Sequence, residues 1–292
     1  MLAYPVGLLN PAPEFPEPLP PPPPPPLRLR GLRAEIRRRI LRARALERVP
    51  PETFGFSVNA ATWLYLITAL AYGWYFRTRV FGIHNLPHGP VILISNHGSH
   101  VLGWDGANIL TACLLAADPP RLVHGMGEHR LMELPVLGRV ARRIGAVDGR
   151  RETCIRLLRA GGAVLTFPEG ARALARPFRD RYQLVPFGHG FVHVALATGA
   201  PIVPVAGIGC EEEAPMLANP AWLCRLLRTP VAPLTATLVV PFPVRYRLHF
   251  GEPIRVRGPA TDDNVAGEVA RVRAALEGLI AHGLAEREHI FF

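Results

Sequence analysis

Short apolar runs, separated by turn residues and by segments with helical periodicity, predict an α/β domain over most of the chain. Runs rich in β-branched residues are typical of buried strands, and six of them occur, at 91–95, 121–125, 163–167, 202–208, 235–240 and 246–250. Helical spacing is found at 105–116, 135–144, 153–160 and 188–198. Strands that alternate with helices favour a mostly parallel sheet. We therefore expect a mixed, mostly parallel sheet flanked by helices in residues 80–292, closed by a helix over 262–287.

From Leu27 the pattern is different, and apolar residues recur at helical spacing among arginines. The apolar positions are Leu29, Leu32, Ile36, Ile40 and Ala43. A basic amphipathic helix of this kind is typical of anionic membrane surfaces. We favour that interpretation, and the alternative is that the apolar stripe packs on the body of the protein.

The next segment, residues 53–76, contains no charged residue and carries aromatic residues toward both ends. Its length is enough to span a bilayer, but Asn59, Thr62 and Thr68 make it a poor span. A shallow or re-entrant membrane helix is our first expectation, a true span the second, and a helix packed on the domain the third. Residues 27–79 are thus expected to form membrane-associated helices at the cytoplasmic face of a membrane.

The first 26 residues are rich in proline and end in an unbroken proline run at 20–26. Such a composition cannot form a packed core. We expect a disordered tail with polyproline II character.

The charge balance narrows the choice of partner. The 292 residues carry a formal net charge of +10, and all 33 basic residues are arginine. The lack of lysine excludes lysine Schiff-base chemistry and the lysine of a phosphate-binding P-loop. Arginine suits phosphate groups, and the charge lies beside apolar and aromatic stretches. We therefore expect membrane lipid as a partner and no nucleic acid, and the oligomeric state stays open.

Two blocks of polar residues follow two of the expected strands. The first runs from Asn96 to Asp105 after the strand at 91–95, and includes His97 and His100. Asp is a good helix N-cap, and Asp105 stands where a helix is expected to begin. The loop can bring His97 or His100 back against this carboxylate. An imidazole oriented by a carboxylate can take a proton from a hydroxyl, which is the base half of a catalytic triad without the serine.

The second block, Phe167-Pro168-Glu169-Gly170, is followed by Arg172, Arg176 and Arg179. Because the carboxyl ends of parallel strands meet at one edge of a sheet, both blocks are expected at the same ligand-binding edge. Gly170 allows close backbone approach, and the arginines are suited to hold a phosphate or another acceptor oxygen. A solvated basic turn is the alternative. The run 211–213, three glutamates after another strand, is expected either to line the acceptor side or to be solvated.

Together these blocks resemble the glycerolipid acyltransferases related to bacterial 1-acylglycerol-3-phosphate acyltransferase. The residues that carry the resemblance are Asn96-His97 with Asp105, Phe167-Pro168-Glu169-Gly170 and Val203-Pro204-Val205. The tract 182–205 is more similar to the branch near mono- and diacylglycerol acyltransferases. The resemblance covers about residues 85–257.

The resemblance implies transfer of a fatty acyl group from an acyl thioester, acyl-CoA or acyl carrier protein, to a glycerolipid or lysophospholipid hydroxyl. It also implies a mixed α/β fold, no metal, no cofactor besides the donor substrate, and membrane association through N-terminal helices. On this mapping the Asp-paired histidine is the general base, and Glu169, Gly170 and Arg172 shape the acceptor site.

The chain departs from the family pattern in three places. The common block N-H-x-S-x-x-D would place Leu102 where an Asp is expected, while Asp105 lies eight positions after His97 and five after His100. We favour His97 as the base and keep His100 as the alternative. Ala171 and Ala173 flank Arg172 where Thr and Ser are usual, and the family's Gly-then-Arg block is only loosely met by Arg150.

Other functions remain open at this point. A thioester hydrolase, or an acyltransferase to a non-glycerol alcohol, would use the same His/Asp pair. A non-catalytic, membrane-bound lipid-binding scaffold would use the proline-rich tail and the basic helix. His189 and His193 have a metal-pair spacing, but without a third ligand nearby we expect a half-buried helix face there.

Overall fold

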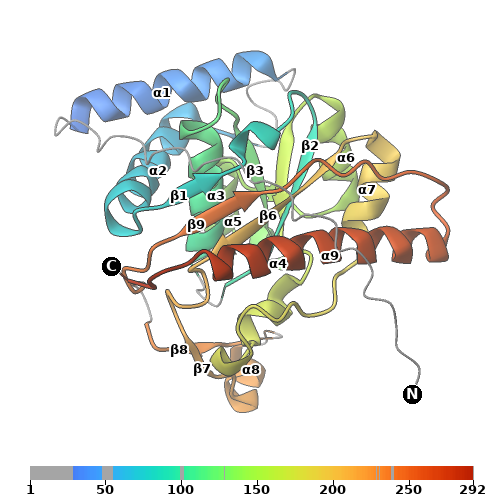
Figure 1. Ribbon diagram of the computed structural model, residues 1–292. Coiled ribbons are helices and arrows are strands. Elements are labelled where there is room, and N and C mark those ends of the chain that lie inside the picture. The colour runs from blue at the N-terminus through green and yellow to red at the C-terminus, as the bar shows by residue number, and fades with distance from the viewer. Residues whose placement is uncertain are drawn as a thin grey trace.

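A seven-stranded sheet forms the centre of the computed structural model (Figure 1), which describes residues 29–47, 55–98, 102–127, 129–227, 229, 231–237 and 240–291. Its strand order is β1-β9-β6-β2-β5-β3-β4. Only β6 and β9 pair antiparallel among these neighbours, so the expected mixed, mostly parallel sheet is confirmed. The strands are β1 (Arg79–Phe81), β2 (Val91–Ser95), β3 (Val123–Gly127), β4 (Val147–Asp148), β5 (Ala163–Thr166), β6 (Ile202–Ile208) and β9 (Arg247–Phe250).

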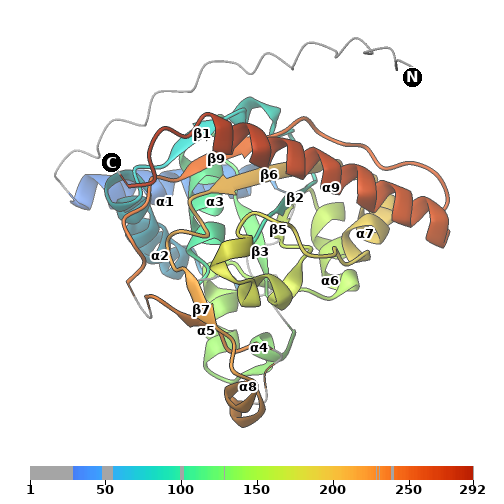
Figure 2. The ribbon, with the colours of Figure 1, turned by 60° about the horizontal axis from the view of Figure 1, so that its bottom comes forward.

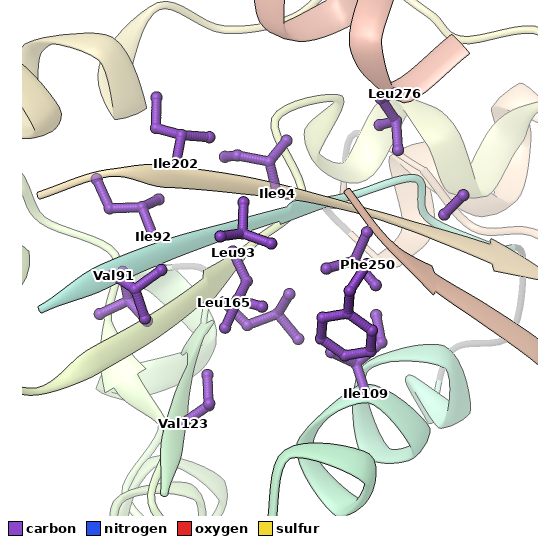
Figure 3. Packing of buried hydrophobic residues seen from close by; sticks show 14 of the residues in the cluster. Val91, Ile92, Leu93, Ile94, Ile109, Val123, Leu165, Ile202, Phe250 and Leu276 are labelled. Carbon is purple, nitrogen blue, oxygen red and sulfur yellow. The ribbon is translucent and has the colours of Figure 1, made fainter. Parts of the chain in front are cut away.

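Helices cover both faces of this sheet. On one face α9 packs on β6, and α6 packs on β5 beside α7; on the other α3 packs on β3 beneath α1 and α2. Figure 3 shows Leu276 of α9 and Ile109 of α3 pointing toward the strands from opposite sides. The helices of this domain are α3 (Trp104–Leu115), α4 (His129–Glu133), α5 (Leu137–Ile144), α6 (Arg151–Arg159), α7 (Gly190–Thr198) and α9 (Asp262–Ala285).

The central strands are apolar along their whole length because both of their faces are covered. Every residue of β2 and of β6 is buried. Val91, Ile92, Leu93 and Ile94 each expose 1% or less of their surface, and they belong to the core cluster drawn in Figure 3. The packing of this core fixes the positions of the ends of β2, β5 and β6 relative to one another.

One expected strand is wrong. Residues 235–240 do not join the main sheet: β8 (Leu234–Thr235) pairs with β7 (Met216–Ala218) in a separate two-stranded sheet, and residues 238–239 lie outside the described part. With α8 (Ala221–Leu227) these strands form a projection from the body of the molecule in both ribbon views (Figures 1 and 2). The apolar run was mistaken for a core strand because exposed apolar residues have the same local pattern.

The N-terminal helices are part of the folded body. The apolar stripe of α1 (Leu29–Leu46) is buried through Ile36, Ile40 and Ala43 in a second core cluster shared with α2 (Val58–Leu70). The structure therefore favours the alternative in which this stripe packs on the protein. The sheet also begins earlier than expected, since β1 pairs with β9 from Arg79 onward.

The segment expected to meet the membrane forms α2 and a short π-helix, η2 (Ala71–Tyr75). Within the described residues, no helix combines the length and the apolar character that crossing a bilayer requires. Tyr65, Leu66 and Ala69 are buried, while Trp63, Ile67 and Trp74 are more than half exposed. One face of this segment thus packs on the domain and another stays open. The proline-rich tail expected at 1–26 lies outside the described residues.

Candidate active site

Three adjacent strands bring the polar blocks to one edge of the sheet. In the order β6-β2-β5, β6 ends before the glutamate run, β2 ends before His97, and β5 ends before Glu169. The backbone N–H of His97 donates to Glu169 Oε1 at 3.2 Å, although 72 positions separate the two residues. The expectation that both blocks meet at one edge is therefore met in the geometry.

His97 and Asp105 are in direct contact. Nδ1 of His97 lies 2.6 Å from Asp105 Oδ2, which also accepts the N–H of Gly98 at 2.8 Å. Asp105 Oδ1 accepts the N–H of Gly106 at 2.7 Å. Asp105 is not the N-cap, because α3 begins one residue earlier with Gly103 as its N-cap. Its side chain is free to bind the loop that carries His97.

The histidine ring is further held by an aromatic neighbour. Phe167 stacks on it, with ring centroids 4.1 Å apart and an interplanar angle of 17°. The side chain of His97 keeps 17% of its surface exposed, against 3% for Asp105. No described group forms a hydrogen bond with Nε2 of His97. The ring is thus oriented on one side and accessible on the other, as a general base requires.

His97 and Asp105 each shift the pKa of the other. Burial is the largest single effect and lowers the pKa of His97, but the charge and hydrogen bond of Asp105, together with the charges of Glu169 and Glu211, outweigh it, and the net pKa is raised. Burial acts to raise the pKa of Asp105, yet His97 and the two backbone N–H donors hold it below its usual value. Asp105 therefore stays charged and strengthens the basicity of His97.

The loop that carries His97 is fixed by close contacts with the end of β6. A Cβ on Gly98 would lie 2.3 Å from the carbonyl oxygen of Cys210, so only glycine fits there. The Asn96 side chain donates to the carbonyl of Gly207 at 3.0 Å and accepts its N–H at 2.8 Å. The asparagine before the base is therefore a structural link between β2 and β6.

A buried ion-pair network lies behind the base. Glu169 is fully buried and its Oε2 accepts from Arg176 at 2.6 Å and from the N–H of Val185 at 2.8 Å. Arg176 also pairs with Glu211. Burial raises the pKa of Glu211 to about 7 against the opposing effect of Arg176. Arg176 is committed to these two carboxylates and is not available to hold a substrate phosphate.

The glutamates at 211–213 are not solvated, since each exposes 2% or less of its surface. Glu212 accepts from the Tyr182 hydroxyl and from Arg287 at 2.6 Å, and Glu213 accepts from the Tyr246 hydroxyl at 2.7 Å. These hydrogen bonds and ion pairs hold the segment after β6 in place at the edge of the sheet that carries the site. The sequence gives no sign of this, because the tyrosines and the arginine that satisfy them are distant along the chain.

The remaining expected site residues are more dispersed. Gly170, with φ of 63°, begins the 3₁₀ helix η4 (Gly170–Ala175) and is exposed, and Arg172 is exposed and donates to the Pro186 carbonyl at 3.0 Å. Arg150 belongs to another group, with Asp148 and His129. His100 lies outside the described residues.

Two apolar spaces are lined by residues that contact His97 or precede Asp105 in the chain. One, of about 210 Å³, is lined by Phe167 and Pro168 with residues of α6 and α7. The other, of about 550 Å³, opens to the surface between η2 and the loop before α3, and its lining includes Trp74, Leu102 and Trp104. Phe167 stacks on His97, and the sequence alone gave it no role; its place directly before Pro168-Glu169 was the available signal.

The chain is similar to known proteins over much of its length. Residues 77–207 match the family model described as Acyltransferase. An uncharacterized protein of Mycobacterium tuberculosis is 35% identical over 257 residues, covering 82% of this chain and 71% of that protein. The "DGAT1/2-independent enzyme synthesizing storage lipids" of Gallus gallus is 27% identical, covering 68% of this chain and 58% of that protein.

The fold has a counterpart among solved structures. The crystal structure of the 1-acyl-sn-glycerophosphate (LPA) acyltransferase PlsC from Thermotoga maritima superposes with a TM-score of 0.50 at 19% identity, covering 78% of this chain and 81% of that one. The match to this family model, together with the 35% identity to a relative that the chain covers to 71%, shows that the chain belongs to the acyltransferase family and is an O-acyltransferase.

Proposed function

We propose that this enzyme transfers a fatty acyl group from an acyl thioester to a hydroxyl of a glycerolipid, with His97 as the general base. The observation that carries the proposal is the 2.6 Å contact of His97 Nδ1 with the buried Asp105, which leaves Nε2 directed away from its orienting carboxylate. A positioned base of this kind accelerates proton transfer by about 10²–10⁴-fold.

The reaction needs one proton to move twice. Nε2 of His97 takes the proton of the acceptor hydroxyl as its oxygen bonds to the thioester carbonyl carbon. The tetrahedral intermediate then collapses, the carbon–sulfur bond breaks, and His97 returns the proton to the departing thiolate. Asp105 stabilises the imidazolium that exists between the two steps.

A neutral glyceride is the acceptor that the site favours. Arg176 forms ion pairs with Glu169 and Glu211. Arg172, flanked by alanines, donates a hydrogen bond to a backbone carbonyl. A phosphorylated acceptor would need free arginine side chains at this edge. The similarity to an enzyme named for storage-lipid synthesis supports the same preference for mono- or diacylglycerol over lysophosphatidate.

The test is thiol release from long-chain acyl-CoA and from acyl carrier protein thioesters by the purified protein. Each donor is combined with monoacylglycerol, diacylglycerol, lysophosphatidate or no acceptor, beside an Asp105→Asn variant. Release that depends on a glyceride and collapses in the variant is expected. Release without an acceptor would instead identify a thioester hydrolase. A folded protein that is inactive with every donor would favour the scaffold function.

The membrane is the expected source of such an apolar acceptor. The groove between η2 and the loop before α3 is lined by apolar and aromatic side chains, and Trp74, Leu102 and Val240 around it are 58–66% exposed. Exposed apolar patches of this kind mark membrane or protein contacts, and the arginines of α1 suit an anionic leaflet. We infer that the groove faces the lipid surface at the cytoplasmic side.

Vesicle co-sedimentation tests this attachment. Trp74→Ser is expected to weaken binding to vesicles containing anionic lipid, while Leu41→Ser, at an exposed leucine of α1 outside the groove, is the matched control. Equal binding by wild type and Trp74→Ser would exclude the groove as the contact. A larger loss in Leu41→Ser would move the contact to α1.

A further inference from the structure

A second cluster of ionisable side chains lies where α9 crosses β9. His249 of β9, with His282 and Glu286 of α9, forms the only group of three potential metal ligands within the described ranges, and their ligand atoms all lie within 4.8 Å of one another. None of the three takes part in the acyl-transfer chemistry described above. They come from segments more than thirty positions apart, so only the tertiary structure assembles them.

His249 is the unusual member of this cluster. It exposes 1% of its surface, and in the described structure neither ring nitrogen has a hydrogen-bond partner. A buried, unsatisfied polar group costs about 1–3 kcal/mol, so such a histidine calls for an explanation. An imidazole nitrogen without a hydrogen-bond partner can offer its lone pair to a metal ion.

The surroundings orient this ring toward α9. Phe81 stacks on it with centroids 4.4 Å apart and an interplanar angle of 2°. A Cβ on Gly283 would lie 3.0 Å from its Nε2, so the absence of a side chain at Gly283 lets the imidazole edge approach the helix. The ring is thus packed in place with one nitrogen directed at the segment that carries the other two ligands.

Glu286 presents its two oxygens to different partners. Oε1 lies 3.1 Å from His282 Nε2, and Oε2 accepts from Arg247 at 2.9 Å. Two ligands about 2.0–2.2 Å from a tetrahedral zinc ion lie about 3.3–3.5 Å apart, close to the first of these distances. The second contact is the kind of outer hydrogen bond that orients a metal-ligating carboxylate.

We propose that His249, His282 and Glu286 bind one divalent transition-metal ion, with Zn²⁺ the best fit to two imidazole nitrogens and a carboxylate oxygen. His282 and Glu286 are partly exposed, which gives the ion a path from solvent, and a water molecule completes four-coordination. The ion clamps the end of α9 to the sheet, one residue before the Arg287 that reaches Glu212.

The experiment is calorimetric titration of the tag-free, EDTA-treated full chain with Zn²⁺, and with Co²⁺ followed by its visible absorption. We expect 1:1 binding, a tetrahedral Co²⁺ spectrum, and a Tm raised by roughly 5 °C at a free Zn²⁺ concentration one hundred times Kd. His282→Ala and Glu286→Gln, both at partly exposed positions, are each expected to weaken binding at least tenfold while folding normally.

The control is the double variant His189→Ala/His193→Ala, which removes an i, i+4 histidine pair at the start of α7. It is expected to keep wild-type stoichiometry and affinity. No binding by the wild-type chain, loss of binding in this control, or unchanged binding in His282→Ala would each overturn the proposal.

Discussion

The part of the chain that the structure describes contains two histidine–aspartate pairs, which differ in distance and in exposure. His97 lies 2.6 Å from Asp105, with side-chain exposures of 17% and 3%. His129 lies 3.1 Å from Asp148, with exposures of 39% and 26%. Each pair joins Nδ1 to a carboxylate, so residue type alone does not tell which pair can act as a base.

The difference lies in the second ring nitrogen and in the surroundings. Nε2 of His129 is already in contact with Glu133 and Arg150, whereas no described group bonds to Nε2 of His97. His97 also stands at the end of a central strand beside an apolar cavity, where burial strengthens its interaction with Asp105. A catalytic base therefore needs a free nitrogen and a low-dielectric setting as well as an orienting carboxylate.

The largest expected effect separates the two histidines directly. His97→Ala should lower kcat/KM for acyl transfer by about 10²–10⁴-fold, because it removes the base. His129→Ala should change it less than twofold, since its ring is occupied by surface partners. Equal losses in the two variants, with folding verified by circular dichroism, would remove the functional distinction between the pairs.

The orienting carboxylates give the next contrast. Asp105→Asn should reduce kcat/KM by about 10²-fold, because the imidazole remains but loses its fixed tautomer and its counter-charge. His97 acts as a base only when neutral, so activity falls as pH drops through its raised pKa. The variant lacks the charge that raises this pKa, and its acid limb should shift to lower pH. Asp148→Asn, measured over the same pH range, should keep the wild-type profile.

The structure also contains one buried and one exposed arginine ion pair, at Arg176 and Arg150. Arg176 is buried between Glu169 and Glu211, and Arg176→Ala should lower the free energy of unfolding by about 3–5 kcal/mol, because it leaves buried charge uncompensated. Arg150 has a side chain that is 55% exposed beside Asp148, and Arg150→Ala should cost at most about 1 kcal/mol. Denaturant titration of both variants measures the difference.

The last contrast concerns the pH dependence of stability at Glu211. Its pKa is raised to about 7 by burial, so the folded chain binds this proton more tightly than the unfolded chain. The stability it contributes is complete below about pH 4.5 and is lost as pH rises to about 7. Glu211→Gln should flatten the unfolding free energy between these limits, by up to about 3 kcal/mol. Glu277→Gln, on the exposed side of α9, should retain the wild-type slope; a steep profile in Glu211→Gln would contradict the assignment.

The local pattern of apolar residues was enough to predict the central strands of the core. The runs that became β2, β5 and β6 were visible because strands buried on both faces are apolar throughout. The polar residues that follow β2 and β5 had to meet, since parallel neighbours end at the same edge. His97, Asp105 and Glu169 were therefore within reach of sequence reasoning.

Several features depended on contacts that no local pattern encodes. The apolar stripe of α1 predicts burial but not whether lipid or protein covers it, and the packing of Ile36 and Ile40 decided that. The run at 235–240 has the composition of a core strand, yet β8, where it begins, pairs with β7 outside the main sheet.

What the sequence by itself determined is the order of strands and helices and the residue types delivered to the strand ends, because hydrophobic periodicity acts over a few residues. Only the tertiary structure decided how those residues pair. It buried Glu211 against Arg176, 35 positions away. It also gave Nε2 of His129 two partners, while Nε2 of His97 has no hydrogen-bond partner among the described residues. It also assembled His249 with His282 and Glu286. Such pairings follow from strand order and helix docking, which bring together side chains that share no local signal.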